Sequence, residues 1–295
     1  MKINRLFILI TILVLFSCNN SNQNNNNVEE FDTCQQISPS GKSETTVFTI
    51  PTPILVPATL KIIDLEFNND IVNYLQNTKT IYTNKNVKAL NLGICFVDLA
   101  YIALYNETQY SYNVLSRIDY LLDELDIENQ TIISSIDKLK SNFSNNDSIS
   151  KIILDSQNKL AEYFQEKNEK EVGVFMICGF YIEGLNLILN SKNKILAKEE
   201  LTPFKKNYLN SLLFEHSVFI DNLIDLTEIY NNKFSKKINN ELKISKVHFN
   251  DLKISIDFDT DNKKIKNIKL DDKKINELET HIEYLRKNII SGILE

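Results

Sequence analysis

Residues 86–105 read NVKALNLGICFVDLAYIALY, and this stretch is apolar on nearly every side when it is wound as an α-helix. A helix that is hydrophobic all round lies in the interior of a protein, surrounded by other elements. A second stretch of this kind spans about 171–190. Two such helices need further helices to cover them. The sequence therefore predicts an all-α, multi-helix bundle built around these two segments.

Apolar residues recur at helical spacing in the segments that would cover this pair. Asn106, with Gln109 three residues later, is expected to cap the start of one of them. Thr202 followed by Pro203 marks another start, because proline is tolerated at the first helical position. The predicted covering helices are 106–125, 130–141, 147–167, 203–230 and 271–293.

Residues 243–270 follow a different pattern. Apolar and polar residues alternate in the runs KISIDF and KIKNIKL, which lie on either side of DTDN at 259–262. Alternation with a period of two around a turn is typical of paired strands. A short β-hairpin is therefore expected near residues 243–270, as the one irregular part of the bundle.

The amino-terminus has the features of an export signal. Lys2 and Arg5 precede an apolar run that ends at Phe16, and Ser17 and Cys18 follow. The run is shorter than the roughly 20 residues that a transmembrane helix needs. A cysteine after Leu-x-Ser resembles the lipobox of bacterial lipoproteins, in which the cysteine receives a diacylglycerol and becomes the first residue after cleavage. The resemblance implies that Cys18 is a lipidation site.

A polar run of Asn, Ser and Gln follows Cys18 and cannot bury apolar surface, so we expect a disordered tether. The predicted organisation is a signal peptide at 1–17, a lipidated Asn-rich tether at 18–47 and a single helical domain at 48–295. In Gram-negative lipoproteins, a residue other than Asp after the lipidated cysteine directs the protein to the outer membrane. Asn19 therefore implies delivery to the outer membrane of the cell envelope.

The charge balance bears on the partners. The chain has 33 Lys and Arg against 39 Asp and Glu, a net charge of −6. Because the signal peptide takes away Lys2 and Arg5 and no acid, the remainder carries −8. An acidic chain is a poor binder of nucleic acid, where neutralisation of phosphates supplies most of the affinity. The lipid on Cys18, and not a charged surface, is expected to hold the protein to the membrane.

Cysteines and histidines indicate no metal or cofactor. Cys95 and Cys178 lie inside apolar runs and are expected to be small buried side chains and not a disulfide. His216, His248 and His281 are scattered, without the spacing of known zinc motifs. The sequence also contains no phosphate-binding loop or dinucleotide-binding fingerprint.

Each of the two most apolar helices carries one acid near its middle, Asp98 and Glu183. A buried carboxylate is costly unless it is hydrogen-bonded or neutralised. Under a structural interpretation, which we favour, both acids bond to Tyr or Asn side chains and fix the helix register. Under a functional interpretation they line a polar pocket between the helices. The candidate pocket residues are Asn91, Asp98, Tyr101, Tyr105, Glu183 and Asn186.

Several segments resemble a family of uncharacterised all-helical lipoproteins from Gram-negative bacteria. They include KALNLGI at 88–94, VDLAY at 97–101, YNETQ at 105–109, and pieces at 50–53, 121–127, 181–185 and 285–289. The resemblance covers most of residues 48–292. It implies a tethered helical domain in the cell envelope and assigns no catalytic residues.

Three functions remain open. The leading one is a lipid-anchored module that binds a protein or a small molecule. The first alternative is an enzyme that uses Asp98 and Glu183 as paired carboxylates, which requires a cleft open to solvent. The second is a purely structural envelope protein, which would have neither a pocket nor an exposed apolar patch.

Overall fold

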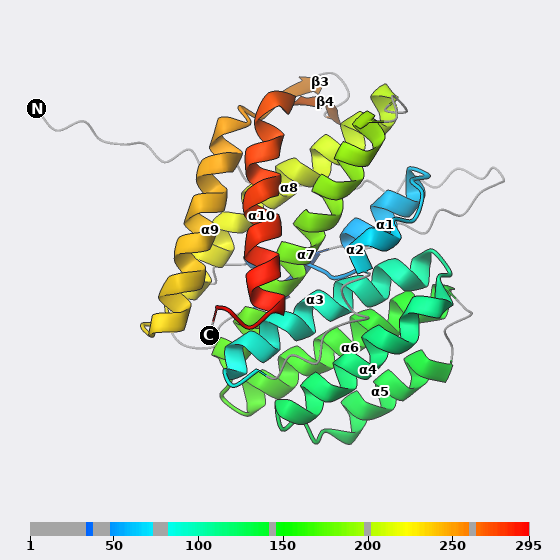
Figure 1. Ribbon diagram of the computed structural model, residues 1–295, viewed down its shortest axis with the longest axis vertical. Helices are drawn as coiled ribbons and strands as arrows, with labels where there is room; N and C mark the ends of the chain where they lie inside the picture. Colours follow the sequence, from blue (N-terminus) through cyan, green and yellow to red (C-terminus); the bar gives the residue numbers. More distant parts are fainter. Residues whose placement is uncertain are drawn as a thin grey trace, which may run out of the picture. The chain divides into compact units, whose positions relative to one another are not determined.

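The computed structural model describes residues 34–37, 48–72, 82–141, 146–197, 202–259 and 264–294. Helix dominates these residues, and the predicted all-α bundle with a short hairpin is confirmed (Figure 1). The helices are α1 (Leu55–Ile62), α2 (Asn69–Val72), α3 (Lys85–Leu104), α4 (Thr108–Glu124), α5 (Gln130–Ser141), α6 (Asn146–Glu166), α7 (Lys170–Ala197), α8 (Pro203–Glu228), α9 (Lys233–Asp251) and α10 (Ile275–Ile290).

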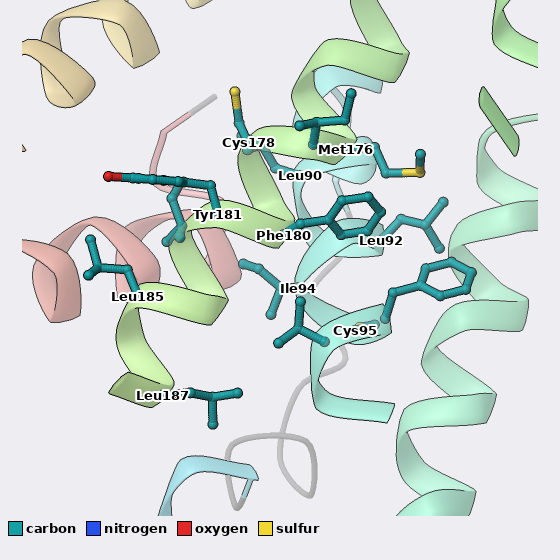
Figure 2. Close-up of a cluster of buried hydrophobic side chains, with 14 of the residues drawn as sticks. Leu90, Leu92, Ile94, Cys95, Met176, Cys178, Phe180, Tyr181, Leu185 and Leu187 are labelled. Atoms are coloured by element: carbon teal, nitrogen blue, oxygen red, sulfur yellow. The ribbon is translucent and has the colours of Figure 1, made fainter. Parts of the chain in front are cut away.

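The two all-round apolar helices, α3 and α7, pack directly against each other. Their backbones meet at two glycines: a Cβ on Gly93 would lie 2.1 Å from the carbonyl oxygen of Met176, and one on Gly179 would lie 2.2 Å from that of Leu90. Figure 2 shows the apolar side chains of both helices around this contact. Both helices are long and apolar enough to cross a membrane, but 89% and 94% of their most apolar windows are buried in the bundle. Burial by other helices accounts for their composition.

The remaining helices cover this pair in two groups. Helices α4 and α6 pack against α3, and α5 packs against α6. Helices α8 and α10 pack against α7, and α9 packs against both α8 and α10 (Figure 1). One core of buried side chains runs through both groups. The described part of the domain is therefore organised around the contact between α3 and α7.

The hairpin is shorter than predicted. Strands β3 (Ser255–Asp259) and β4 (Lys264–Lys269) are antiparallel, with Ser255 opposite Lys269. Residues 243–251, which the alternating pattern placed in the hairpin, instead end helix α9. Asn232 caps the start of that helix by accepting a hydrogen bond from Ser235 N at 2.8 Å. The prediction was wrong because a short window of sequence does not distinguish a strand from a helix. Ile244, which is exposed on α9, gave this window the alternation of apolar and polar residues that is typical of a strand.

Two predicted helix starts had different outcomes. The cap at Thr202 is confirmed, since its Oγ1 accepts a hydrogen bond from Lys205 N at 3.3 Å. The cap at Asn106 is wrong. Asn106 has a φ of 60° and lies just after the end of α3. The N–H of the next residue, Glu107, donates back to Ile102 O in the last turn of that helix at 3.0 Å. Asparagine tolerates this left-handed conformation, so it ends one helix without capping the next.

At the amino-terminal side, β1 (Cys34–Ile37) pairs with β2 (Phe48–Pro51), and β1 lies within the range assigned to the tether. The signal peptide and Cys18 lie outside the described residues. Cys95 and Cys178 are both buried and free, which confirms the prediction that they do not form a disulfide.

Candidate functional site

The two central acids lie in the interior, as the sequence predicted. The side chains of Asp98 and Glu183 are both 0% exposed. Burial raises the pKa of the Cys95 thiol, and the negative charge of Asp98 and, to a smaller degree, that of Glu183 raise it further. Both carboxylates therefore act on one thiol, which indicates that the fold brings them into the same part of the core.

Glu183 is compensated by a basic residue from another helix. Arg286 of α10 donates from Nε to the Glu183 carboxylate and from Nη2 to the carbonyl oxygen of Ile71 at 3.1 Å. Asn186 Nδ2 donates to Glu183 Oε1 at 3.0 Å, and Asn190 in turn donates to Asn186 Oδ1 at 2.9 Å. The predicted pair Glu183 and Asn186 is thus brought together, in an ion pair that fastens α10 and the end of α2 to α7.

Asn91 belongs to a second group of contacts. Its Nδ2 donates to Ile289 O at 3.2 Å, and the Tyr82 hydroxyl lies 2.9 Å from Asn91 Oδ1 and 2.6 Å from Ile290 O. Arg117 of α4 donates to the same hydroxyl. The last carbonyl groups of a helix have no hydrogen-bond donor within the helix. These bonds supply donors to such carbonyl groups at the end of α10. Asn91 therefore fixes the end of α10 on α3.

Tyr101 and Tyr105 form a third group, with the loop before α2. The Phe67 ring stacks on Tyr101 at 4.8 Å between centroids, and the Tyr101 hydroxyl accepts a hydrogen bond from Asn68 N at 2.7 Å. Burial raises the pKa of Tyr101 to about 12 and also raises that of Tyr105. The Tyr105 hydroxyl is buried, and no described residue bonds to it. These tyrosines act as packing residues for the connecting loop.

Five of the six predicted pocket residues, all but the buried Asp98, thus make three sets of contacts that join parts of the fold. A hollow of about 320 Å³ lies between α8 and α9, and none of the six lines it. Its walls are polar and include Thr227 and Asn239, which are hydrogen-bonded to each other at 2.9 Å. The full burial of Glu183 and its hydrogen bond from Asn186 match the structural interpretation, whereas its ion pair with Arg286 was not predicted. This burial does not match the solvent-open cleft of the enzymatic alternative.

Sequence reasoning missed a second buried ion pair. The ammonium of Lys192, which is 0% exposed, lies 2.8 Å from Asp272 Oδ1 and donates to Asn210 Oδ1 at 2.8 Å. Burial lowers the pKa of Lys192. For Asp272, burial acts to raise the pKa, but hydrogen bonds from Lys192 and Lys206 outweigh it and lower the pKa. This pair joins the end of α7 to the segment between β4 and α10.

Helix α8 clamps the hairpin beside this ion pair. The side chain of Asn207 accepts from Ile268 N at 2.9 Å, and Asn210 donates to Ile268 O at 2.7 Å, so both backbone groups of one β4 residue are bound. Ile268 is itself buried. A two-stranded hairpin is marginal alone, and here side-chain bonds from a helix hold it in place.

The outer part of the same hairpin carries exposed apolar side chains. Ile256 is 40% exposed, Phe258 56% and Ile265 48%. Phe258 and Ile265 are directly opposite each other across the strands, and Ile256 is two residues from Phe258. Directly opposite residues point to one face, so Phe258 and Ile265 share a face. Ile256 lies across an irregularity in the register between Asp257 and Phe258, and its opposite residue is the buried Ile268. We call these three side chains the hairpin patch.

No family model, no curated protein and no solved structure is similar to this chain.

Proposed function

We propose that this chain is a lipid-anchored protein of the bacterial cell envelope that binds a partner protein through the hairpin patch. The observation that carries the proposal is the exposure of Ile256, Phe258 and Ile265 on a hairpin that α8 holds in place. A contiguous exposed apolar patch on a soluble surface is typical of an interaction site. A purely structural protein has no need of one.

The form of the patch favours a protein over a small molecule. Small-molecule sites are concave and enclose most of the ligand. The hairpin patch instead belongs to a pair of strands that lies where α9 ends and α10 begins (Figure 1). Apolar side chains on a hairpin suit the flat contact of a protein interface, where a few apolar anchors supply most of the binding energy.

The charge around the patch indicates the character of the partner. The chain is acidic overall, at −6, yet exposed lysines lie around the hairpin, at Lys253, Lys266 and Lys273, and the exposed Asp257 is paired with Lys269. Opposite charges at the rim of an interface speed association and select the partner. The proposed partner surface is an apolar patch with an acidic rim.

The attachment to the membrane comes from the amino-terminus. The signal-like residues 1–17, Cys18 in a lipobox-like position and the polar run after it support a lipid anchor with a tether. A tether would leave the helical domain free to present the patch to proteins of the envelope. Delivery to the outer membrane is part of the same proposal and rests on Asn19.

Site-specific photocrosslinking in intact cells tests the proposed interface. A photoreactive residue at Phe258 is expected to yield a discrete adduct, whereas one at Tyr112, which is 80% exposed on α4, is expected to yield none. In the chain that carries the crosslinker at 258, Ile265→Ser and Lys266→Glu should weaken the adduct, and Tyr112→Ser should leave it unchanged. Equal adducts from positions 258 and 112, or no adduct from 258, would refute the interface.

A further inference from the structure

A cluster of metal-ligating side chains lies where α9 ends and α10 begins. His248 and Asp251 are three residues apart in the last turns of α9, which places them on one face, and Glu277 is in the first turn of α10. One ring nitrogen of His248 and one carboxylate oxygen from each acid all lie within 4.8 Å of one another. Ligands around a bound zinc ion are about 3–4 Å apart, so small side-chain rotations would close this set.

The histidine of this cluster has an unsatisfied ring nitrogen. Nδ1 of His248 is shielded from solvent and has no hydrogen-bond partner in the part of the chain that the structure describes. Buried polar atoms almost always have a partner, so this one points to a group that is not protein. The His281 ring packs 5.4 Å from that of His248 and is itself held by a bond of 3.1 Å to Glu241 O. The imidazole of His248 is therefore held in place by its neighbour.

The surrounding charge also favours a cation. Lys274 Nζ lies 2.7 Å from Glu277 Oε1. An exposed lysine thus neutralises one of the two acids. The carboxyl end of α9 adds the partial negative charge of a helix terminus. A divalent ion would satisfy both acids and His248 at once, which a single ammonium does not.

We propose that His248, Asp251 and Glu277 bind one divalent transition-metal ion of the zinc class. One imidazole and two carboxylates form a mixed nitrogen and oxygen set, which suits zinc and its neighbours better than calcium or magnesium. The remaining coordination positions would be filled by water. The ion would join the two helices that flank the hairpin. The proposal does not depend on the hairpin patch having a partner.

Zinc binding by the full-length chain in detergent, measured by competition with a chromophoric chelator, tests the proposal. We expect one zinc ion per chain. His248→Gln and Glu277→Gln should each weaken binding about tenfold or more, as losses around metal sites do. Lys274→Met should tighten binding severalfold, because it removes the competing cation. The matched control is Glu228→Gln, which alters another exposed carboxylate paired with a lysine, Lys243, and should have no effect.

The cobalt-loaded protein identifies the ligands. Imidazole and carboxylate ligands give visible bands without the intense near-ultraviolet absorption of a thiolate, so this spectrum separates the proposed site from binding by cysteine. Helical circular dichroism of each variant checks that it is folded. Unchanged affinity in His248→Gln, a thiolate spectrum, or no effect of Lys274→Met would each overturn the proposal.

Discussion

Arg286 of α10 donates to the carboxylate of Glu183 in the middle of α7, and that carboxylate has no exposure to solvent. The arginine is 13% exposed, so the two partners differ in their access to water. This difference determines how each substitution should act, because the group that is left behind is either a sealed carboxylate or a guanidinium at the edge of the core.

The first prediction concerns this pair. Arg286→Met should lower the free energy of unfolding by about 3–5 kcal/mol, because it leaves a buried charge without its partner. Glu183→Gln should cost about 1–3 kcal/mol, because the amide keeps the shape and the arginine still reaches water. Urea denaturation followed by circular dichroism measures both. In the double variant the cost should be well below the sum of the single costs, and simple additivity would show that the ion pair contributes nothing.

The second prediction concerns the contact between α3 and α7. Gly93→Ala and Gly179→Ala should each destabilise the fold by about 3 kcal/mol or more, because each new methyl group would overlap a backbone carbonyl that cannot yield. Gly173→Ala is the matched control on α7, since its Cβ would meet nothing closer than Phe164 at 3.6 Å. That variant should be neutral or stabilised by up to about 1 kcal/mol through helix propensity. Equal effects at all three glycines would contradict the close approach.

The third prediction concerns acid stability. Burial lowers the pKa of His216 to about 4, against an ordinary value of 6.5, and its Nδ1 lies 2.9 Å from Leu212 O. The unfolded chain therefore binds a proton more readily than the folded one. The neutral ring therefore makes its full contribution to the free energy of unfolding above pH 6.5. This contribution falls by about 3 kcal/mol as the pH drops to 4.

The variant His216→Phe isolates this effect, because its ring cannot titrate. Burial raises the pKa of the adjacent Glu215 to about 6, so this residue makes the free energy of unfolding increase as the pH falls through the same range. The pH dependence of the native chain alone would therefore not reveal the effect of His216. Both proteins are unfolded with urea at intervals between pH 4 and 7.5. The native chain should lose stability relative to His216→Phe as the pH falls, and parallel curves would rule out a buried neutral histidine.

The fourth prediction concerns the anchor. Cys18→Ser should abolish lipidation, leave the signal attached and produce a larger precursor on a denaturing gel. Metabolic labelling with a palmitate analogue measures the modification directly. Cys34→Ser is the control, because it removes a cysteine from the same region and should leave labelling intact. Labelling that persists in Cys18→Ser would place the lipid elsewhere, and a native chain that takes up no label would show that none is attached.

The fold was predictable because its strongest signal is local. Segments that are apolar all round, such as 86–105, have to be buried, and their length identifies them as helices. Helix α9 was not predicted, although Phe234, Ile238 and Leu242 are buried at helical spacing, because most of its other residues are polar and Ile244 faces solvent. The end of α9 and the two strands that follow it together resembled one run of alternating apolar and polar residues.

The candidate site was predicted only in part. The burial of Asp98 and Glu183 followed from their helices, but the grouping of six residues into one pocket required knowing which faces meet. The close contact of α3 and α7 at Gly93 and Gly179 determines which faces of the two helices meet. This contact cannot be predicted from the sequence of either helix alone. One signal was available: after residue 17 the chain has two arginines, Arg117 and Arg286, among many lysines. Both contact buried polar groups, since arginine suits such positions better than lysine.

The pairing of α3 with α7 also sets the order in which the chain can fold. Helix α3 is complete at Leu104, and α4 can cover one side of it from Thr108 onward, but α7, which packs against it most extensively, begins only at Lys170. Contacts between distant segments form slowly, because a long loop has to close first. During synthesis, which starts at the amino-terminus, the chain therefore exposes apolar surface of α3 until α7 has been made. The chain is most prone to aggregate during this interval.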